Sequence, residues 1–259
     1  MKIIPLASGS KGNATLISHG GKAFLIDCGI PLRVLKERLL SVGFSLNEID
    51  FALITHEHSD HIYSCEQLSD SFGIPLYSHE KILRGTCRFF DKKLKNMAQF
   101  TNFNGFKTGD FTITPFFTPH DAFTVGYRIA TDNKSLVYIT DTGRCDNSLI
   151  EISAGADLVM IEANHDKEML INGSYPPYLK RRILSDNGHL SNETTAEIIA
   201  KMASNGTKKF ILAHLSEENN TREKAYSTVA QRLNKEGFRE SDYLISVAGQ
   251  HFVLPETEI

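Results

Sequence analysis

The sequence predicts an α/β fold, and two observations support this prediction. Short runs rich in β-branched and apolar residues dominate the first half of the chain, whereas helical periodicity is most pronounced in the last third. No internal repeat, low-complexity tract or linker divides the sequence. We therefore expect residues 1–259 to form a single domain, with strands grouped in sheets and helices packed outside them.

The expected elements follow one another in two groups of strands and a helical end. Glycines punctuate the first group, and the expected strands are residues 2–7, 14–18, 22–27 and 51–55. Residues 31–42 repeat apolar side chains at helical spacing, and Pro31 suits a first helical turn. The second group of strands comprises residues 110–118, 124–131 and 136–140. Next come a strand at 157–162, helices at 192–203 and 222–236, and a strand at 210–213 between these helices.

Composition limits the classes of function. The chain carries a net charge of -3 and has a sequence pI of about 6.4, which excludes a globally basic nucleic-acid binder but allows a local basic patch. The first residues lack the apolar run of a signal peptide, and no segment is apolar enough to span a membrane. We therefore expect a cytoplasmic protein with reduced, structural thiols, and the alternative for Cys65 is a role in binding zinc.

The strongest chemical signal is the segment Thr55-His56-Glu57-His58-Ser59-Asp60-His61, directly after an apolar strand. Residues two apart in an extended segment point the same way, so His56 and His58 can bind one ion. A helix that begins near Asp60 would direct Asp60 and His61 toward a neighbouring position. Imidazole and carboxylate ligands in this mixture suit zinc, with manganese or iron as alternatives. A solvated histidine-rich loop is the competing interpretation, but so dense a cluster behind a buried strand favours metal binding.

Three more polar residues stand just past apolar runs. They are His120, Asp141 and His214, which follow the expected strands at 110–118, 136–140 and 210–213. A side chain at such a position leaves the core and can reach a shared cleft. Each residue alone could belong to a surface loop, but together with the first cluster they would complete two coordination spheres.

This order of motifs resembles the metallo-β-lactamase-fold hydrolases over nearly the whole chain. The resemblance implies a four-layer αββα sandwich with two divalent ions. It implies that His56, His58 and His120 hold one ion, that Asp60, His61 and His214 hold the other, and that Asp141 bridges them. It also implies that Asp27, which ends an expected strand, supports the histidine loop from behind the ligands.

Further motifs resemble the YycJ/WalJ group of bacterial exonucleases within this superfamily. They are the segments at 7–13, 162–166, 187–192 and 213–220. The Gly-His-Leu-Ser stretch at 188–191 is also similar to ribonuclease J and related β-CASP nucleases, in which this histidine serves catalysis. However, the segment between Asp141 and His189 is too short for an inserted β-CASP domain, so a substrate clamp of that kind and firm RNA specificity do not carry over.

The resemblance and the ligand set together predict a DNA exonuclease that uses a metal-bridging hydroxide as nucleophile. Two ions, less two carboxylates and one hydroxide, leave a cluster about one unit positive, which attracts phosphate esters. His189 and Asp60 are the catalytic candidates, and His189 is suited to act as general acid or as donor to a phosphoryl oxygen. Candidate substrate contacts are Ser8, Ser10, Asn13, Asn164, His165, Lys180, Arg181 and Arg182.

Other functions remain open from the sequence. A small-molecule phosphodiesterase acting on cyclic phosphates is the main alternative, followed by a thioester hydrolase. A non-catalytic metal-binding module is less compatible with a complete ligand set. The ligands accept zinc and manganese alike. The expected partner is nucleic acid, DNA first, without a membrane, and the sequence predicts no particular oligomeric state.

Overall fold

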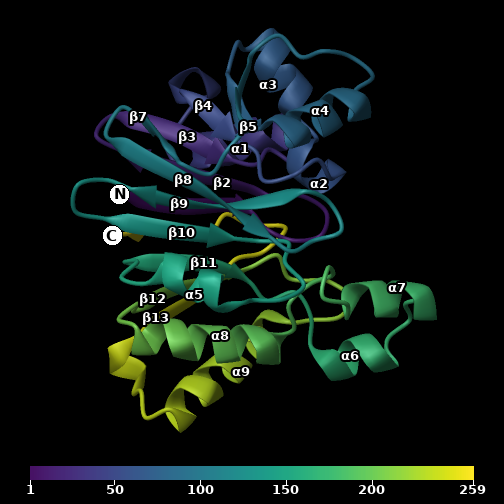
Figure 1. Ribbon diagram of the computed structural model, residues 1–259, viewed down its shortest axis with the longest axis vertical. Coiled ribbons are helices and arrows are strands. Elements are labelled where there is room, and N and C mark those ends of the chain that lie inside the picture. Colours follow the sequence, from purple (N-terminus) through teal and green to yellow (C-terminus); the bar gives the residue numbers. More distant parts are fainter.

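The computed structural model describes residues 1–259, which form two seven-stranded sheets that face each other (Figure 1). The first sheet has the order β14-β1-β2-β3-β4-β5-β6. Its strands are β1 (Lys2–Ala7), β2 (Ala14–His19), β3 (Lys22–Ile26), β4 (Phe51–Leu53), β5 (Leu76–His79), β6 (Met97–Phe100) and β14 (Thr257–Glu258). The carboxyl-terminal strand β14 pairs antiparallel with β1, so the two ends of the chain meet at one edge of this sheet.

The second sheet has the order β13-β12-β11-β10-β9-β8-β7. Its strands are β7 (Phe106–Thr108), β8 (Phe111–Thr118), β9 (Thr124–Ala130), β10 (Ser135–Ile139), β11 (Leu158–Glu162), β12 (Lys209–Ala213) and β13 (Leu244–Val247). The strands from β10 to β13 are parallel, while β9 is antiparallel to both β8 and β10. Consequently β8, β10, β11 and β12 all end at the same edge of the sheet.

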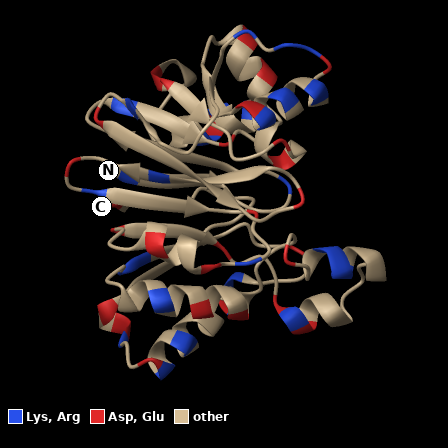
Figure 2. Ribbon diagram, viewed as in Figure 1, with Lys and Arg blue, Asp and Glu red and all other residues tan.

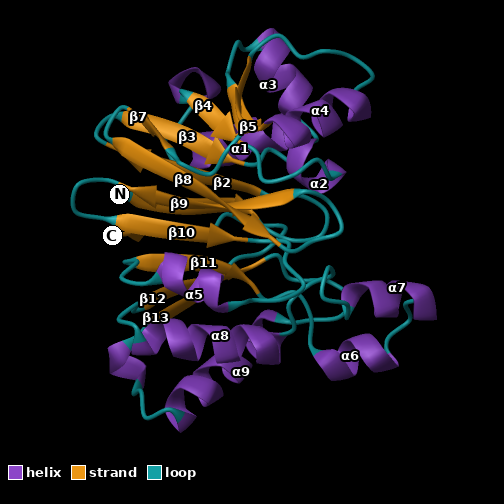
Figure 3. Ribbon diagram, viewed as in Figure 1, coloured by secondary structure: helices purple, strands orange, loops and turns teal.

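Helices cover the outer faces of both sheets (Figure 3). The helices that accompany the first sheet are α1 (Leu32–Ser41), α2 (Ser59–Ile62), α3 (Cys65–Ser71) and α4 (Glu80–Phe89). Those that accompany the second are α5 (Asn147–Ser153), α6 (Lys167–Asn172), α7 (Pro177–Ile183), α8 (Asn192–Ser204) and α9 (Arg222–Lys235). Two 3₁₀ turns complete the chain, η1 (Leu46–Glu48) and η2 (Glu240–Asp242). This is the predicted α/β arrangement of two sheets flanked by helices, so the predicted fold class is confirmed.

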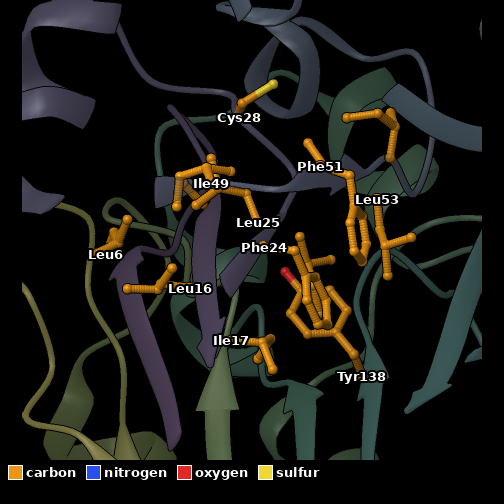
Figure 4. Close-up of a cluster of buried hydrophobic side chains, with 14 of the residues drawn as sticks. Leu6, Leu16, Ile17, Phe24, Leu25, Cys28, Ile49, Phe51, Leu53 and Tyr138 are labelled. Atoms are coloured by element: carbon orange, nitrogen blue, oxygen red, sulfur yellow. The ribbon is translucent and has the colours of Figure 1, made fainter. Parts of the chain in front are cut away.

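The alternation of side chains along β10 shows why its sequence is apolar throughout. Leu136 and Tyr138 belong to the core between the sheets, whereas Val137 and Ile139 belong to a second core under α8 and α9. A strand covered on both faces reads as a continuous apolar run. Figure 4 shows Tyr138 reaching from the second sheet to Phe24 and Ile17 of the first. None of the helices combines the length and the apolar composition that crossing a membrane requires.

The strands predicted from the sequence are present with small shifts of their ends, but several short elements were not predicted. The expected strand at 22–27 ends at Ile26, and Asp27 follows it with a left-handed φ of 60°. Elements without an expectation include β5, β6, α3, α4, α6, α7 and β13. Most of them span no more than seven residues, too few for a periodic pattern to emerge.

Candidate metal centre

The ends of the parallel strands bring the predicted ligands together. β8, β10 and β12 end just before His120, Asp141 and His214 respectively, at one edge of the second sheet. The histidine-rich segment follows β4 in the opposing sheet and leads into α2, and in Figure 1 α2 lies on the side where the β10 arrow ends. The carboxyl edge of a parallel sheet is a common place for ligands to bind.

Three residues at the strand ends around this cluster, one after β3 of the first sheet and two after β10 and β12 of the second, have backbone conformations that residues other than glycine seldom adopt. Asp27, Asp141 and His214 have φ values of 60°, 54° and 55°, and only one other non-glycine residue in the chain has a positive φ. Such conformations cost of order 1–3 kcal/mol each and are concentrated at functional sites. Each of them follows the end of a strand, and its side chain lies within 3.5 Å of another residue of the cluster.

The candidate ligand atoms fall into overlapping groups in which all atoms lie within 4.8 Å of one another. One group is His56, His58 and His120, and another is Asp60, His61 and His214. Asp141 lies between them, because its Oδ2 is 3.2 Å from His61 Nε2 while its Oδ1 is 3.5 Å from His214 Nε2 and 3.8 Å from His120 Nε2. The seven predicted ligands therefore converge on one place.

Three of the histidines have hydrogen-bond partners on Nδ1, so that their Nε2 atoms face the centre. The Nδ1 of His61 lies 2.7 Å from Asp27 Oδ2, that of His120 lies 3.0 Å from Gly188 O, and that of His56 lies 3.1 Å from Thr55 Oγ1. Nε2 of His56 is buried and has no hydrogen-bond partner within the protein. A buried, unpaired nitrogen among other imidazoles and the Asp141 carboxylate fits a bound cation, and partners on the far ring nitrogen are typical of metal-binding histidines.

The protonation pattern points to the same chemistry. Burial opposes a charge on His214, but Asp141, Asp60 and Glu162 outweigh it and raise the pKa of His214 to about 10. Burial likewise opposes charge on His61, yet Asp141, Asp27 and Asp60 raise its pKa well above the usual value. Without a metal, protons on these imidazoles balance the clustered carboxylates. Divalent cations would supply that positive charge instead.

Glu162 is a site residue that was not predicted from the sequence. It ends β11, is fully buried, and its Oε1 lies 2.6 Å from His189 Nδ1 and 3.1 Å from His214 Nδ1. Burial would raise the pKa of Glu162, but His189 and His214 lower it to about 2, so the carboxylate is charged. The sequence pattern that pointed to Asp141 also applies to Glu162, because both residues stand at the end of an apolar run.

His189 lies at the open side of the cluster. Its side chain is 17% exposed, whereas that of His214 is 2% exposed, and its Nδ1 is 3.8 Å from Asp141 Oδ1. Its ring stacks on that of His214 with centroids 5.3 Å apart. Since Glu162 holds Nδ1, the other ring nitrogen is available to a substrate.

Asp121 was also not predicted, and it links the cluster to α7. Its Oδ1 lies 3.2 Å from His120 Nε2 and 3.5 Å from His58 Nε2, and its Oδ2 accepts a 2.6 Å hydrogen bond from Arg182 Nε. Arg182 remains about half exposed, so the ion pair sits at the entrance to the site.

Most of the other residues expected to bind substrate have their polar atoms engaged within the protein. Ser8 Oγ accepts a 2.8 Å hydrogen bond from His214 N, and Asn164 Nδ2 donates to His214 O at 2.9 Å. Asn13 bonds to Gly9 and has Nδ2 3.1 Å from His61 Nε2. Lys180 Nζ donates to the carbonyls of Ile171 and Gly173.

The remaining three residues of that set differ in exposure. Ser10 and Arg181 are exposed. His165 is buried, and neither of its ring nitrogens has a hydrogen-bond partner. Burial lowers the pKa of His165 to about 4, so its imidazole is neutral at physiological pH.

Cys65 lies outside the metal-binding clusters. Its Sγ is 3.1 Å from Cys28 Sγ, and both thiols are fully buried. Burial raises the pKa of Cys65 well above its usual value. No group of candidate ligands in the chain includes Cys65.

The chain is similar to known proteins in both sequence and structure. The family model described as a β-lactamase superfamily domain matches residues 22–215. The chain is 40% identical to exodeoxyribonuclease WalJ of Streptococcus pneumoniae over 88% of this chain and 86% of the relative. It is 35% identical to exodeoxyribonuclease YycJ of Bacillus anthracis over 90% and 89% of the two chains. The crystal structure of the metallo-β-lactamase-fold protein YhfI from Bacillus subtilis superposes with a TM-score of 0.75, at 21% identity and 99% coverage of both chains.

Proposed function

The chain belongs to the β-lactamase superfamily and is a metal-dependent hydrolase of phosphodiester bonds, and from this premise we propose that it removes nucleotides from DNA ends. The names of its two exodeoxyribonuclease relatives, which match most of the chain, support DNA as the substrate. The observation that carries the proposal is the convergence of seven ligands beside a Glu162–His189 pair.

We propose two divalent ions, zinc or manganese. His56, His58 and His120 would hold one, Asp60, His61 and His214 would hold the other, and Asp141 would contact both. Bound there, such ions would lower the pKa of water enough to yield a nucleophile at neutral pH and would offset negative charge on the phosphate.

Protein residues at the open side of the cluster would donate protons and contact the phosphate. Glu162 accepts from His189 Nδ1 and so fixes the ring, which leaves the other nitrogen to donate a proton to the leaving oxygen or a hydrogen bond to a phosphoryl oxygen. Arg182 at the entrance could contact the phosphate backbone after exchanging its Asp121 partner for it. The four cysteines form no disulfide, which suits a cytoplasmic protein.

To test this function, the purified protein is given added manganese or zinc and assayed with three substrates. They are an end-labelled DNA oligonucleotide, a bis-aryl phosphodiester and a thioester. We expect mononucleotides from the DNA, and loss of this activity in Asp141→Asn. The matched control is Asp157→Asn, because Asp157 precedes β11 at the opposite edge of the sheet and pairs with Lys134.

Other results would contradict the proposal. Hydrolysis of the bis-aryl ester with intact DNA would indicate a phosphodiesterase for small molecules. Inactivity toward all three substrates with both ions bound would indicate a metal-binding module.

A further inference from the structure

Four aromatic rings, from β5, β8 and the segments that follow β6 and β8, form a row. His79, which ends β5, lies between Phe123 and Phe103, with ring centroids 4.6 Å and 5.9 Å away. Phe117 of β8 continues the row at 5.8 Å from Phe123. We call Phe103, His79, Phe123 and Phe117 the ring row. Its inner member His79 is buried, but the end members Phe117 and Phe103 are 49% and 40% exposed.

The ring row adjoins the ligand group formed by His56, His58 and His120. Phe117 and Phe123 stand three residues before and three residues after His120, at the two ends of the turn that presents it. On the other side, α4 begins directly after His79 and packs on the histidine-rich segment. The approach is so close that a Cβ on Gly85 would lie 2.7 Å from Glu57 Cδ.

The charges beside the rings are suited to a polyanion. Lys81 Nζ lies 4.8 Å from the centroid of the Phe123 ring. Arg84 and Arg88 follow on α4, and of these Arg84 pairs with Glu80 at 3.0 Å. Figure 2 shows basic residues on both α4 and α7, on the side of the molecule where β10 ends. Partly exposed aromatic side chains at both ends of the row, next to cations and a phosphodiesterase centre, match a nucleotide, which has a flat base and a charged phosphate.

We propose that the ring row is a platform on which unpaired bases of a DNA strand stack while a phosphate of that strand enters the metal centre. The inference rests on the proposed function and deepens it. Bases stack on aromatic side chains with little dependence on sequence, because every base has a π-face. A platform of this kind would therefore position the end of a strand without reading its sequence.

Equilibrium binding of a labelled single-stranded oligonucleotide tests the platform. A phosphorothioate backbone prevents turnover, and a second oligonucleotide carries abasic sites near the end. Phe117→Ala should weaken binding of the normal oligonucleotide at least about fivefold. It should have a much smaller effect on the abasic one, which wild-type protein should already bind more weakly. Phe72→Ala is the matched control, because Phe72 is 36% exposed and has Lys36 Nζ 4.5 Å from its ring, yet lies outside the ring row.

The outcomes separate this inference from the proposed function. If both wild type and Phe117→Ala degrade DNA, and the two proteins bind each oligonucleotide equally well, the platform is wrong and the nuclease proposal stands. Equal weakening of normal and abasic oligonucleotides would show that Phe117 does not contact bases, which also overturns the inference. If wild-type protein neither degrades nor binds DNA, both proposals fail together.

Discussion

Asp27 and His61 form a fully buried pair in which Asp27 Oδ2 lies 2.7 Å from His61 Nδ1. Asp27 Oδ1 accepts hydrogen bonds from the backbone and the hydroxyl of Thr55, so one carboxylate fixes both ends of the histidine-rich segment. Nε2 of His61 faces Asp60 and Asp141, and when His61 gives up its second proton, Asp27 keeps the remaining one on Nδ1 and leaves Nε2 unprotonated.

Asp27→Asn should weaken metal binding while leaving the fold intact. Asparagine tolerates the left-handed φ of 60° and can still accept from Thr55 through its oxygen. Its amide would then donate to His61 Nδ1, which favours the tautomer with a proton on Nε2, where the metal would bind. The expected loss in metal affinity is about 10–100-fold. Titration with a competing chelator measures it, and unchanged affinity together with an unchanged melting temperature would exclude this role for Asp27.

His214→Ala should weaken the binding of one ion and leave the binding of the other unchanged. His214 belongs to the group with Asp60 and His61, whereas His56, His58 and His120 form a separate group. Elemental analysis after extensive dialysis should therefore give one tightly held ion per chain. His19→Ala is a suitable control because His19 ends β2 and packs against Phe111, away from the cluster. Two tight ions in the His214 variant would remove His214 from the ligands.

The pair of His189 and Glu162 allows catalysis and metal binding to be separated. His189→Ala should keep the metal content and lower kcat at least ~100-fold, within the usual range for general acid–base catalysis. Glu162→Gln should lower kcat as well. It should also lower the affinity for the ion that His214 would hold, because Glu162 contacts the imidazoles of both His189 and His214. Kinetics and metal analysis on the same preparations check this difference. Normal turnover in His189→Ala would leave His189 a purely structural role.

The sequence predicts the seven residues that converge, because each candidate ligand follows a recognisable apolar strand. The same rule extends to Glu162, which closes β11 just as Asp141 follows β10. By contrast, Asp121 and Arg182 are far apart in the chain and lie in segments without periodicity, so their ion pair arises only from tertiary folding. The left-handed conformations of Asp27, Asp141 and His214 were equally inaccessible, since they result from packing around the strand ends.

Predicted substrate contacts illustrate a second limit of sequence patterns. Lys180, Arg181 and Arg182 form one basic run, yet they differ in the structure. Lys180 binds backbone carbonyls, Arg182 pairs with Asp121, and Arg181 is exposed. A run of basic residues indicates exposed cations, but partners from other segments decide which cation is free to bind phosphate.

Metal binding should release protons, with a dependence on pH that follows from His214. The pKa of His214 is raised from 6.5 to about 10 in the metal-free protein, by Asp141, Asp60 and Glu162 against the effect of burial. The raised pKa stabilises the metal-free fold fully below pH 6.5, and this contribution is lost as the pH rises toward 10. Metal ligation requires the neutral imidazole, so binding at pH 7.5 should expel the proton of His214. Calorimetry in buffers of different ionisation enthalpy measures this release. It should decline as the pH approaches 10 and should be smaller in His214→Ala, and a release independent of pH and of His214 would contradict the charge balance of the cluster.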